Sequence, residues 1–599
     1  MSEHGLTARE ACGNTVRNLT ASPLAGIDPK ELFDVTPYVQ ASYEYFLRNP
    51  ICQEMGRKIK PAFSSSDQDS AFTYFHDFGF IPRLNKAGER GFKVVVGGGL
   101  GAVSMVAHTA YEFLAADQII PFMEAAIRVF DRYGEREKRM KARMKFLIKQ
   151  LGFDKFMELV HEEWPAIKNK SVVIDESRVP ALGKISPDNF AAIEPINSAM
   201  YNTWLQTNVV EQKQGGYRAV WIRIPLGNLN AEQTRLLAAT IKEYASDDVR
   251  LTVNQGMLLR YVPPTALPHL FNSLYALNLG LPGFDTTADI TACPGTDTCA
   301  LGVTNSTGLA TRLEQLVREE YPEMVTENNI RIKISGCMNA CGQHMAANIG
   351  FHGSSIKFDG KVAPAMQVVV GGGIAPDGRG FVAEKVIKLV TKRIPEAVRR
   401  LFADYSDAAE TGEYYNDYVQ RLGKRYFYNL LKDLGDTASL KGEDFHDWGQ
   451  DHDYRQEIGV GECAGVSLDV VGTILNDAHL KIQAASTSLQ AGAFADAGYH
   501  AYSSMIVGAK AILLAADVKC NTHVGILRDF AEHYPELSAE IGDFETTVLK
   551  LKSSDPTETF ITAYYATALR FVNRVTETRE AQLQTTGTDK VVIGEYYKA

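Results

Sequence analysis

Three stretches of this chain occur twice, in the same order and at comparable spacings. Residues 92–101 (FKVVVGGGLG) return as residues 366–375 (MQVVVGGGIA). The other two pairs are GRKIKPAFS with NIRIKISGC and ACGNTVRN with ACPGTDTC, which begin at Gly56, Asn329, Ala11 and Ala292. Self-similarity of this kind indicates a duplicated structural unit. We therefore expect two related domains, at residues 1–170 and 286–438.

In each copy, helical periodicity follows the apolar run that ends in Gly-Gly-Gly. The helices expected from it are 103–116, 119–149, 383–403 and 413–434. The segment 211–285, between the copies, alternates strand and helix patterns and predicts a β-α-β-β-α unit, a ferredoxin-like half-domain. Its expected elements are 217–224, 231–245, 249–261 and 265–277. These patterns indicate the α+β class, with one half-domain between two pseudo-twofold copies and a linker at 171–210.

Four cysteines of the second copy lie in two close pairs. Cys293 and Cys299 form C-x5-C, and Cys337 and Cys341 form C-x3-C. Neighbouring glycine, asparagine, serine and threonine residues suit tight turns whose backbone N–H groups can point at sulfur. Four such thiols most often hold a metal or an iron–sulfur cluster. Zinc is a weaker alternative because its structural sites generally use C-x(2–4)-C spacing, and four reduced structural cysteines are another.

The composition argues against several classes of protein. The chain has 599 residues, 45% of them hydrophobic and 22% charged, which allows several domains with ample cores. Its formal net charge of −10 argues against general nucleic-acid binding. Eight cysteines in so long a chain do not make a disulfide framework, and no apolar run approaches the roughly 18 residues of a membrane span. We expect a cytoplasmic protein with no membrane segment.

The motif ACPGTDTC-x-LG, followed by SGC-x-N-x-CGQH, resembles the sirohaem-dependent nitrite and sulfite reductases, and the likeness extends over roughly residues 5–435. The resemblance implies a 4Fe–4S cluster on the four thiols. It also implies that Cys341 bridges this cluster to the iron of sirohaem. Met338 replaces a proline often found between the last two thiols, and we expect methionine to be tolerated there.

The family's substrate-binding cations, carried over position by position, match Arg17, Lys58 and Lys60. Alone, each would more often be a solvated surface residue. We place them, together with Asn18, where the second copy carries its thiols. Lys58 and Lys60 share one face if their segment is a strand, and converging cations suit the binding and protonation of an oxyanion.

Sirohaem is a polycarboxylate, so its pocket needs cations and polar donors. Besides Cys341, the expected contacts are Asn18, Arg250, Asn254, Gln255, Lys333, Asn339, Gln343 and His344. No GxGxxG fingerprint is present, so electrons should come from a separate ferredoxin or flavoprotein. The basic stretch 136–145 is a candidate docking site, although a solvated helix face explains it as well.

The resemblance implies a second half-domain before the first copy, and we expect it to be missing from this chain. We expect a fragment or a mis-set start, with roughly 80 residues encoded in frame upstream, the length of the 215–291 segment. Residues 439–465 are polar and predict a linker. Residues 466–599 show helical periodicity and resemble an all-helical, HEPN-like domain.

The resemblance implies an assimilatory sulfite reductase haemoprotein that carries out the six-electron reduction of sulfite to sulfide. Lysine at both positions 58 and 60 looks like the sulfite pattern, because nitrite reductases of the family often carry Asn at the second position. A second cation also suits a dianion better than a monoanion. Three alternatives remain: a ferredoxin-dependent nitrite reductase that forms ammonia, a non-catalytic, truncated iron–sulfur protein, and a helical regulatory or nucleic-acid-interacting module fused to an enzyme remnant.

Overall fold

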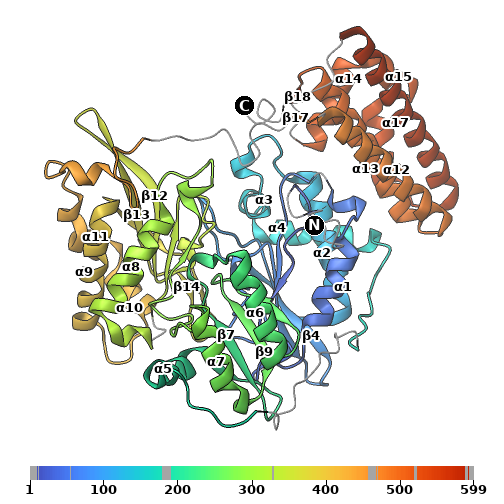
Figure 1. Ribbon diagram of the computed structural model, residues 1–599. Helices are drawn as coiled ribbons and strands as arrows, with labels where there is room; N and C mark the ends of the chain where they lie inside the picture. Colours follow the sequence, from blue (N-terminus) through green and yellow to red (C-terminus); the bar gives the residue numbers. More distant parts are fainter. Residues whose placement is uncertain are drawn as a thin grey trace.

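The protein consists of four groups of elements that follow one another along the chain (Figure 1). Two copies of a sheet domain flank a smaller half-domain, and a helical bundle lies beside the first copy. The computed structural model describes residues 10, 13–53, 55–177, 190–326, 330–455, 467–468, 470–518, 522–586 and 591–592. No helix in these ranges is both long and apolar enough to cross a membrane.

Both copies contain a five-stranded sheet with the same strand order. In the first copy, the order is β1 (Thr20–Ala21), β2 (Pro61–Phe63), β3 (Phe78–Leu84), β4 (Arg90–Val96) and β5 (His108–Ala115). In the second, it is β10 (Thr291–Ala292), β11 (Ile332–Ser335), β12 (Ile349–Phe358), β13 (Lys361–Val370) and β16 (Glu384–Val390). Each sheet has two parallel pairings followed by two antiparallel ones. The predicted duplication is confirmed.

Two of the three predicted echoes are wrong in register. Thr291 pairs with Lys333 in the second sheet, as Thr20 pairs with Ala62 in the first. The strand Thr291–Ala292 therefore corresponds to Thr20–Ala21, and the echo that began at Ala11 starts too early. Sheet register follows the hydrogen-bond ladder and the buried face rather than matches of single letters.

The strand pairings also change the alignment of the second repeated stretch, GRKIKPAFS with NIRIKISGC. Lys333 pairs with Gly350, as Ala62 pairs with Gly79, so Lys333 corresponds to Ala62 and not to Lys60. Arg17, Asn18, Lys58 and Lys60 therefore do not occupy the places of the thiols, contrary to the prediction. They lie on the segments that lead into β1 and β2.

The helix predicted at 103–116 is wrong over most of its length, and the helix predicted at 383–403 is wrong at its start, residues 384–390. The chain forms the strands β5 and β16 there, and helices follow them. Without these strands, β4 and β13 would expose open edges, and pairing the next segment to them satisfies the free N–H and C=O groups. The helices that cover the two sheets are α2 (Ile119–Tyr133), α3 (Met144–Leu151), α4 (Phe153–Glu163), α8 (Ser306–Glu320), α9 (Ile394–Ala408), α10 (Tyr415–Leu422) and α11 (Lys424–Leu431).

The half-domain contains the predicted β-α-β-β-α order, preceded by one further strand, β6 (Val209–Glu211). Its other elements are β7 (Arg218–Ile222), α6 (Ala231–Tyr244), β8 (Val249–Leu251), β9 (Met257–Val262) and α7 (Leu267–Ala276), and the sheet order is β6-β7-β9-β8. The preceding segment, expected as a linker, contains helix α5 (Ser198–Asn208). The ring of Trp204 on α5 is fully buried and lies 5.4 Å from that of Phe271. This helix thus packs as part of the half-domain.

Residues 439–455, also expected as a linker, pack on the second copy. The hydroxyl of Tyr454 donates to the carbonyl of Val303 at 2.6 Å. The carboxylate of Asp447, 1% exposed, accepts from the backbone N–H of Asn305 at 2.7 Å. This stretch therefore lies against the loop that follows the first thiol pair.

The described part of residues 466–599 is helical. It comprises α12 (Val470–Gln490), α13 (Phe494–Ala515), α14 (His523–His533), α15 (Pro535–Glu540), α16 (Phe544–Leu549) and α17 (Glu558–Thr586), with a short pair of strands, β17 (Ser467–Leu468) and β18 (Val591–Val592). One apolar cluster joins the bundle helices. Its likeness to HEPN domains stays a prediction.

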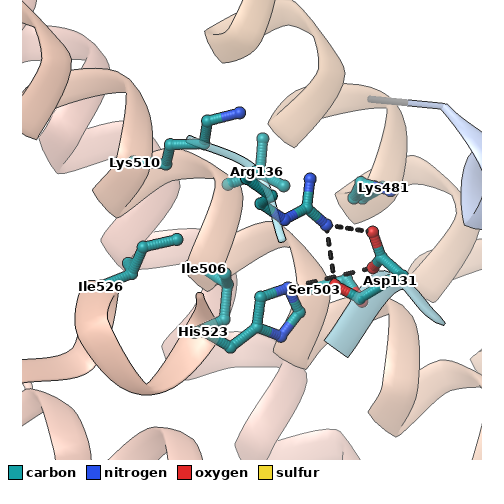
Figure 2. A pocket seen from close by; sticks show the side chains of 9 residues that line it. Asp131, Arg136, Lys481, Ser503, Ile506, Lys510, His523 and Ile526 are labelled. Carbon is teal, nitrogen blue, oxygen red and sulfur yellow. Dashed lines mark hydrogen bonds and ion pairs between the residues drawn. The ribbon is translucent and has the colours of Figure 1, made fainter. Parts of the chain in front are cut away.

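Buried charges join this bundle to helix α2 of the first copy. The guanidinium of Arg128 is fully buried, 2.5 Å from Glu124 and 2.9 Å from Asp496, and it lies over the ring of Tyr499 at 4.1 Å. Glu163 completes this group at 3.6 Å. In Figure 2, a second group lies at the same junction, where His523 of α14 faces Asp131 of α2. One buried ion pair, Arg128–Asp496, therefore joins the bundle to α2 and restricts its orientation.

Replacing Arg128 with methionine should destabilise the protein, because Glu124, Glu163 and Asp496 would remain buried without their cation. Removing one partner of a buried ion pair typically costs about 3–5 kcal/mol. The urea midpoint of unfolding should therefore fall clearly. Arg574→Met, which removes an exposed ion pair with Glu540, is the matched control and should leave the midpoint unchanged. Equal midpoints for both variants would contradict this account of the junction.

Candidate functional site

The two thiol pairs meet because their loops follow neighbouring parallel strands. Cys293 comes directly after β10, and Cys337 follows β11, its partner in the sheet. The backbone N–H of Gly336 donates to the sulfur of Cys293 at 3.1 Å. Asn339 donates to the sulfur of Cys337 through its backbone and its side chain. The predicted N–H donors to sulfur are therefore present.

Glycines allow these loops to touch backbone to backbone. Gly295 has a φ of 53°, and a Cβ atom there would lie 2.6 Å from the carbonyl oxygen of Thr304. A Cβ atom on Gly336 would lie 2.5 Å from the Cα of Gly295. A larger residue at either position would push the loops, and with them the thiols, apart.

The thiols form a group without converging on one point. Burial, and then the neighbouring Cys293 and Cys299, raise the pKa of the Cys337 thiol, so these three groups sense one another. Within the described ranges, no three His, Cys, Asp or Glu side chains are placed to hold a single metal ion. A 4Fe–4S cluster takes each thiolate on a different iron, so four neighbouring thiols are the donor set that such a cluster needs.

The predicted substrate cations lie together in the first copy. Val16 forms a parallel bridge with Ile59, and the backbone N–H of Arg17 donates to the Ile59 carbonyl at 2.9 Å. This pairing places Arg17 beside both Lys58 and Lys60. Burial, followed by the charges of Lys60 and Arg17, lowers the pKa of Lys58 to about 7.

Lys60 connects this group to the thiols of the second copy. Burial lowers its pKa, Arg143 and Arg17 lower it further, and the carboxylate of Asp77 and the Cys341 thiol act in the opposite sense. Cys341 is exposed and lies within electrostatic reach of Lys60. The structure thus brings the first copy's cations to the last thiol of the second copy.

Sequence reasoning missed one member of the cation group, Arg143. Its guanidinium donates to Asp77 at 2.7 Å, and the same carboxylate oxygen accepts from the backbone N–H of Lys60 at 2.9 Å. The basic stretch that contains Arg143 is not one helix face. Arg136 pairs with Asp131, and Lys145 donates to the carbonyls of Gly99, Leu100 and Val103. The break between η5 (Arg139–Lys141) and α3 separates Arg143 from the helix that the sequence predicts over 119–149.

The other predicted sirohaem contacts fall into two groups. Asn254 and Gln343 both accept hydrogen bonds from the Lys333 ammonium, at 3.0 and 3.1 Å, and Asn339 lies beside Cys337. The side-chain amide of Gln255 donates to the carbonyl of Ala292 and accepts from the N–H of the same residue. The ring of His344 is hydrogen-bonded to the hydroxyl of Ser335. These four side chains and Asn339 surround the thiol loops.

Arg250 and Asn18 lie outside this group. Arg250 donates to the carbonyls of Pro23 and Ala25, and so fastens the half-domain to the first copy. Asn18 is exposed, with a φ of 56°. The geometry therefore gives Arg250 an anchoring task, and contact of either residue with sirohaem stays a prediction.

Family profiles account for most of the chain outside the helical bundle. A profile described as "Nitrite and sulphite reductase 4Fe-4S domain" matches residues 12–168 and 283–436. The chain belongs to the nitrite and sulphite reductase family. A second profile, "Nitrite/Sulfite reductase ferredoxin-like half domain", matches residues 210–277. The family predicted from the thiol motif is thus confirmed, and with it a 4Fe–4S cluster and sirohaem as the cofactors of this oxidoreductase.

Some relatives are named as nitrite reductases and others as sulfite reductases. The chain is 26% identical to a ferredoxin–nitrite reductase of Synechococcus elongatus, over 67% of this chain and 74% of that protein. It is 27% identical to a ferredoxin sulfite reductase of Mycolicibacterium paratuberculosis, over 70% and 71%. The solved NirA protein of Mycobacterium tuberculosis superposes with a TM-score of 0.58 at 26% identity, over 71% and 74%.

The thiol loops give a direct test of cluster binding. Cys337→Ser should lower the iron and labile sulfide bound per chain to a small fraction of the parent value, because a hydroxyl is a far weaker iron ligand than a thiolate. Cys52→Ser is the matched control, since burial raises the pKa of the Cys52 thiol to about 12. That variant should keep its iron. Loss of iron from both variants, or from neither, would contradict the assignment of the ligands.

Proposed function

We propose that this protein reduces sulfite to sulfide by six electrons, with a 4Fe–4S cluster on Cys293, Cys299, Cys337 and Cys341 and sirohaem bound beside Cys341. The observation that carries the proposal is the position of Lys60, which lies among buried cations and within reach of that thiol. The cofactors, when bound, supply electrons one at a time to the anion. The residues of the chain hold this anion and provide its protons.

Arg17, Lys58, Lys60 and Arg143 form the anion site in this proposal. Burial and mutual repulsion depress the pKa values of Lys58 and Lys60, and an anion between them relieves both costs. Asp77 holds Arg143 and the backbone of Lys60 in position. The cations therefore meet the substrate already oriented, which favours charge stabilisation during reduction.

Lys58 is our candidate proton donor. A general acid is most effective when its pKa lies near the working pH, and that of Lys58 is about 7. Its ammonium can release a proton to a departing oxygen of the substrate and regain one from solvent. Lys60 and Arg17 would hold the anion meanwhile.

The choice of sulfite rests on the second lysine, since two ammonium groups favour a dianion more than monoanionic nitrite. Nitrite reduction to ammonia is the second candidate, because the relatives include enzymes named for either substrate. A non-catalytic cluster protein is less well supported, since a carrier has no use for buried converging cations. Ferredoxin, named in both relatives, is the proposed electron donor, and the reduced thiols suit a cytoplasmic location.

Reduced methyl viologen assays with each anion test the substrate. The holoprotein should show a sirohaem absorption spectrum and a higher kcat/KM for sulfite than for nitrite. Lys60→Asn should shift this ratio towards nitrite by about tenfold, equivalent to about 1.4 kcal/mol. Lys155→Asn, on the exposed face of α4, should leave it unchanged. A nitrite preference in the parent would select the second candidate, and iron without sirohaem or turnover would select the carrier.

The pH dependence of turnover tests Lys58. Nitrite keeps its charge from pH 6 to pH 9, so it is the better probe here. Because the pKa of Lys58 is about 7, its ammonium is present below that pH and is lost above it. The kcat/KM for nitrite should therefore fall as pH rises through about 7. Lys58→Met should lower kcat/KM and remove its fall above about pH 7. If the variant keeps the same fall, the titrating group is another residue.

A further inference from the structure

The first copy has a counterpart for each thiol, in a register that the strand pairings define. The backbone N–H of Cys293 donates to the carbonyl of Ile334 at 3.2 Å. At the equivalent place, the backbone N–H of Ser22 donates to the carbonyl of Phe63 at 2.8 Å. Ser22 follows β1 as Cys293 follows β10, and a proline comes next in both copies. Ser22 therefore corresponds to Cys293.

The second loop matches equally well. The N–H of Gln343 donates to the carbonyl of Ala340 at 3.0 Å, and the N–H of Phe72 donates to that of Asp69 at 3.0 Å. All four residues have positive φ, between 48° and 61°, which is uncommon for residues other than glycine. Ser70 therefore stands at the place of Cys341.

The same alignment places Asp28 opposite Cys299 and Ser66 opposite Cys337. The spacing C-x5-C is thus matched by S-x5-D, and C-x3-C by S-x3-S. Four polar residues with oxygen atoms occupy the four positions that carry thiols in the other copy.

Hydrogen bonds cross-link the loops of the first copy. The hydroxyls of Ser22 and Ser70 lie 2.6 Å apart. The hydroxyl of Ser65 lies 3.0 Å from that of Ser22 and donates to the carboxylate of Asp28 at 2.7 Å. Ser22, Ser65 and Asp28 are at most 4% exposed. We call Ser22, Asp28, Ser65 and Ser70 the serine network.

We propose that the first copy retains the framework of a second four-thiol cluster site, in which the serine network performs the cross-linking that a cluster performs in the second copy. Ser22 and Ser70 bond to each other directly, and Ser65, which precedes Ser66, links Ser22 to Asp28. The corresponding thiols of the second copy need iron to be joined. The first copy should therefore close its loops without iron, and its framework should accept a 4Fe–4S cluster once thiols are restored.

Restoring the thiols gives the first test. The variant Ser22→Cys/Asp28→Cys/Ser66→Cys/Ser70→Cys, reconstituted anaerobically with iron and sulfide, should bind about twice the iron and labile sulfide per chain of the parent. A control with four added thiols at exposed helical-bundle positions, Thr487, Ser553, Thr557 and Thr559, should bind no more than the parent. Parental iron content in a variant that keeps the parental unfolding midpoint would overturn the proposal.

Ser65→Ala gives a second test that does not depend on the fourfold variant. It removes the hydrogen bonds to both Ser22 and Asp28, so amide hydrogen exchange of residues 22–28 should accelerate at least tenfold, in iron-loaded and iron-free protein alike. Ser42→Ala is the control, because Ser42 is buried and bonds only within its own helix. Unchanged exchange at 22–28, or acceleration in iron-free protein alone, would overturn the role of the network.

Discussion

The site depends on one constraint: a loop that leaves the end of a strand must lie beside the loop that leaves its parallel neighbour. β10 and β11 place Cys293 next to Gly336 in this way. In the first copy, β1 and β2 place Ser22 next to Ser65. The same backbone arrangement therefore brings the two loops together in both copies, and the side chains that the loops carry differ.

Sequence patterns predicted the parts of the site whose chemistry is explicit in single letters. Four thiols at two short spacings admit few alternatives, and the β-α-β-β-α order of the half-domain follows from alternating periodicities. The thiol spacings and the order of the half-domain are local features, so no knowledge of pairing partners is needed to find them. The lysine pair at 58 and 60 comes instead from the family resemblance, and the structure places both residues beside Arg17.

Features that depend on pairing could not be predicted in this way. Two of the repeated stretches are aligned in the wrong register because they match single letters, such as Ala-Cys. The true register is set by the hydrogen bonds between neighbouring strands, which single letters do not show. The periodicity of β5 and β16 predicts helices, because their role as partners of β4 and β13 is not visible in their own sequence. The basic stretch predicts a solvated face at Arg143, because Asp77, which holds this residue, is distant in the chain. The sequence predicts a linker at α5, although Trp204 makes this helix part of the half-domain core.

Both copies must hold two neighbouring loops together, and they do so with side chains of different chemistry. In the first copy, neutral hydroxyls and one carboxylate close the loops, and the cations lie outside them, on the segments before β1 and β2. In the second, the loops carry the thiols themselves, and cross-linking them requires iron and deprotonation. A copy that closes without a cofactor can hold Lys58, Lys60 and Arg17 in place before any cluster is present. Cofactor binding then has to order only the second copy, against a first copy whose cations are already positioned.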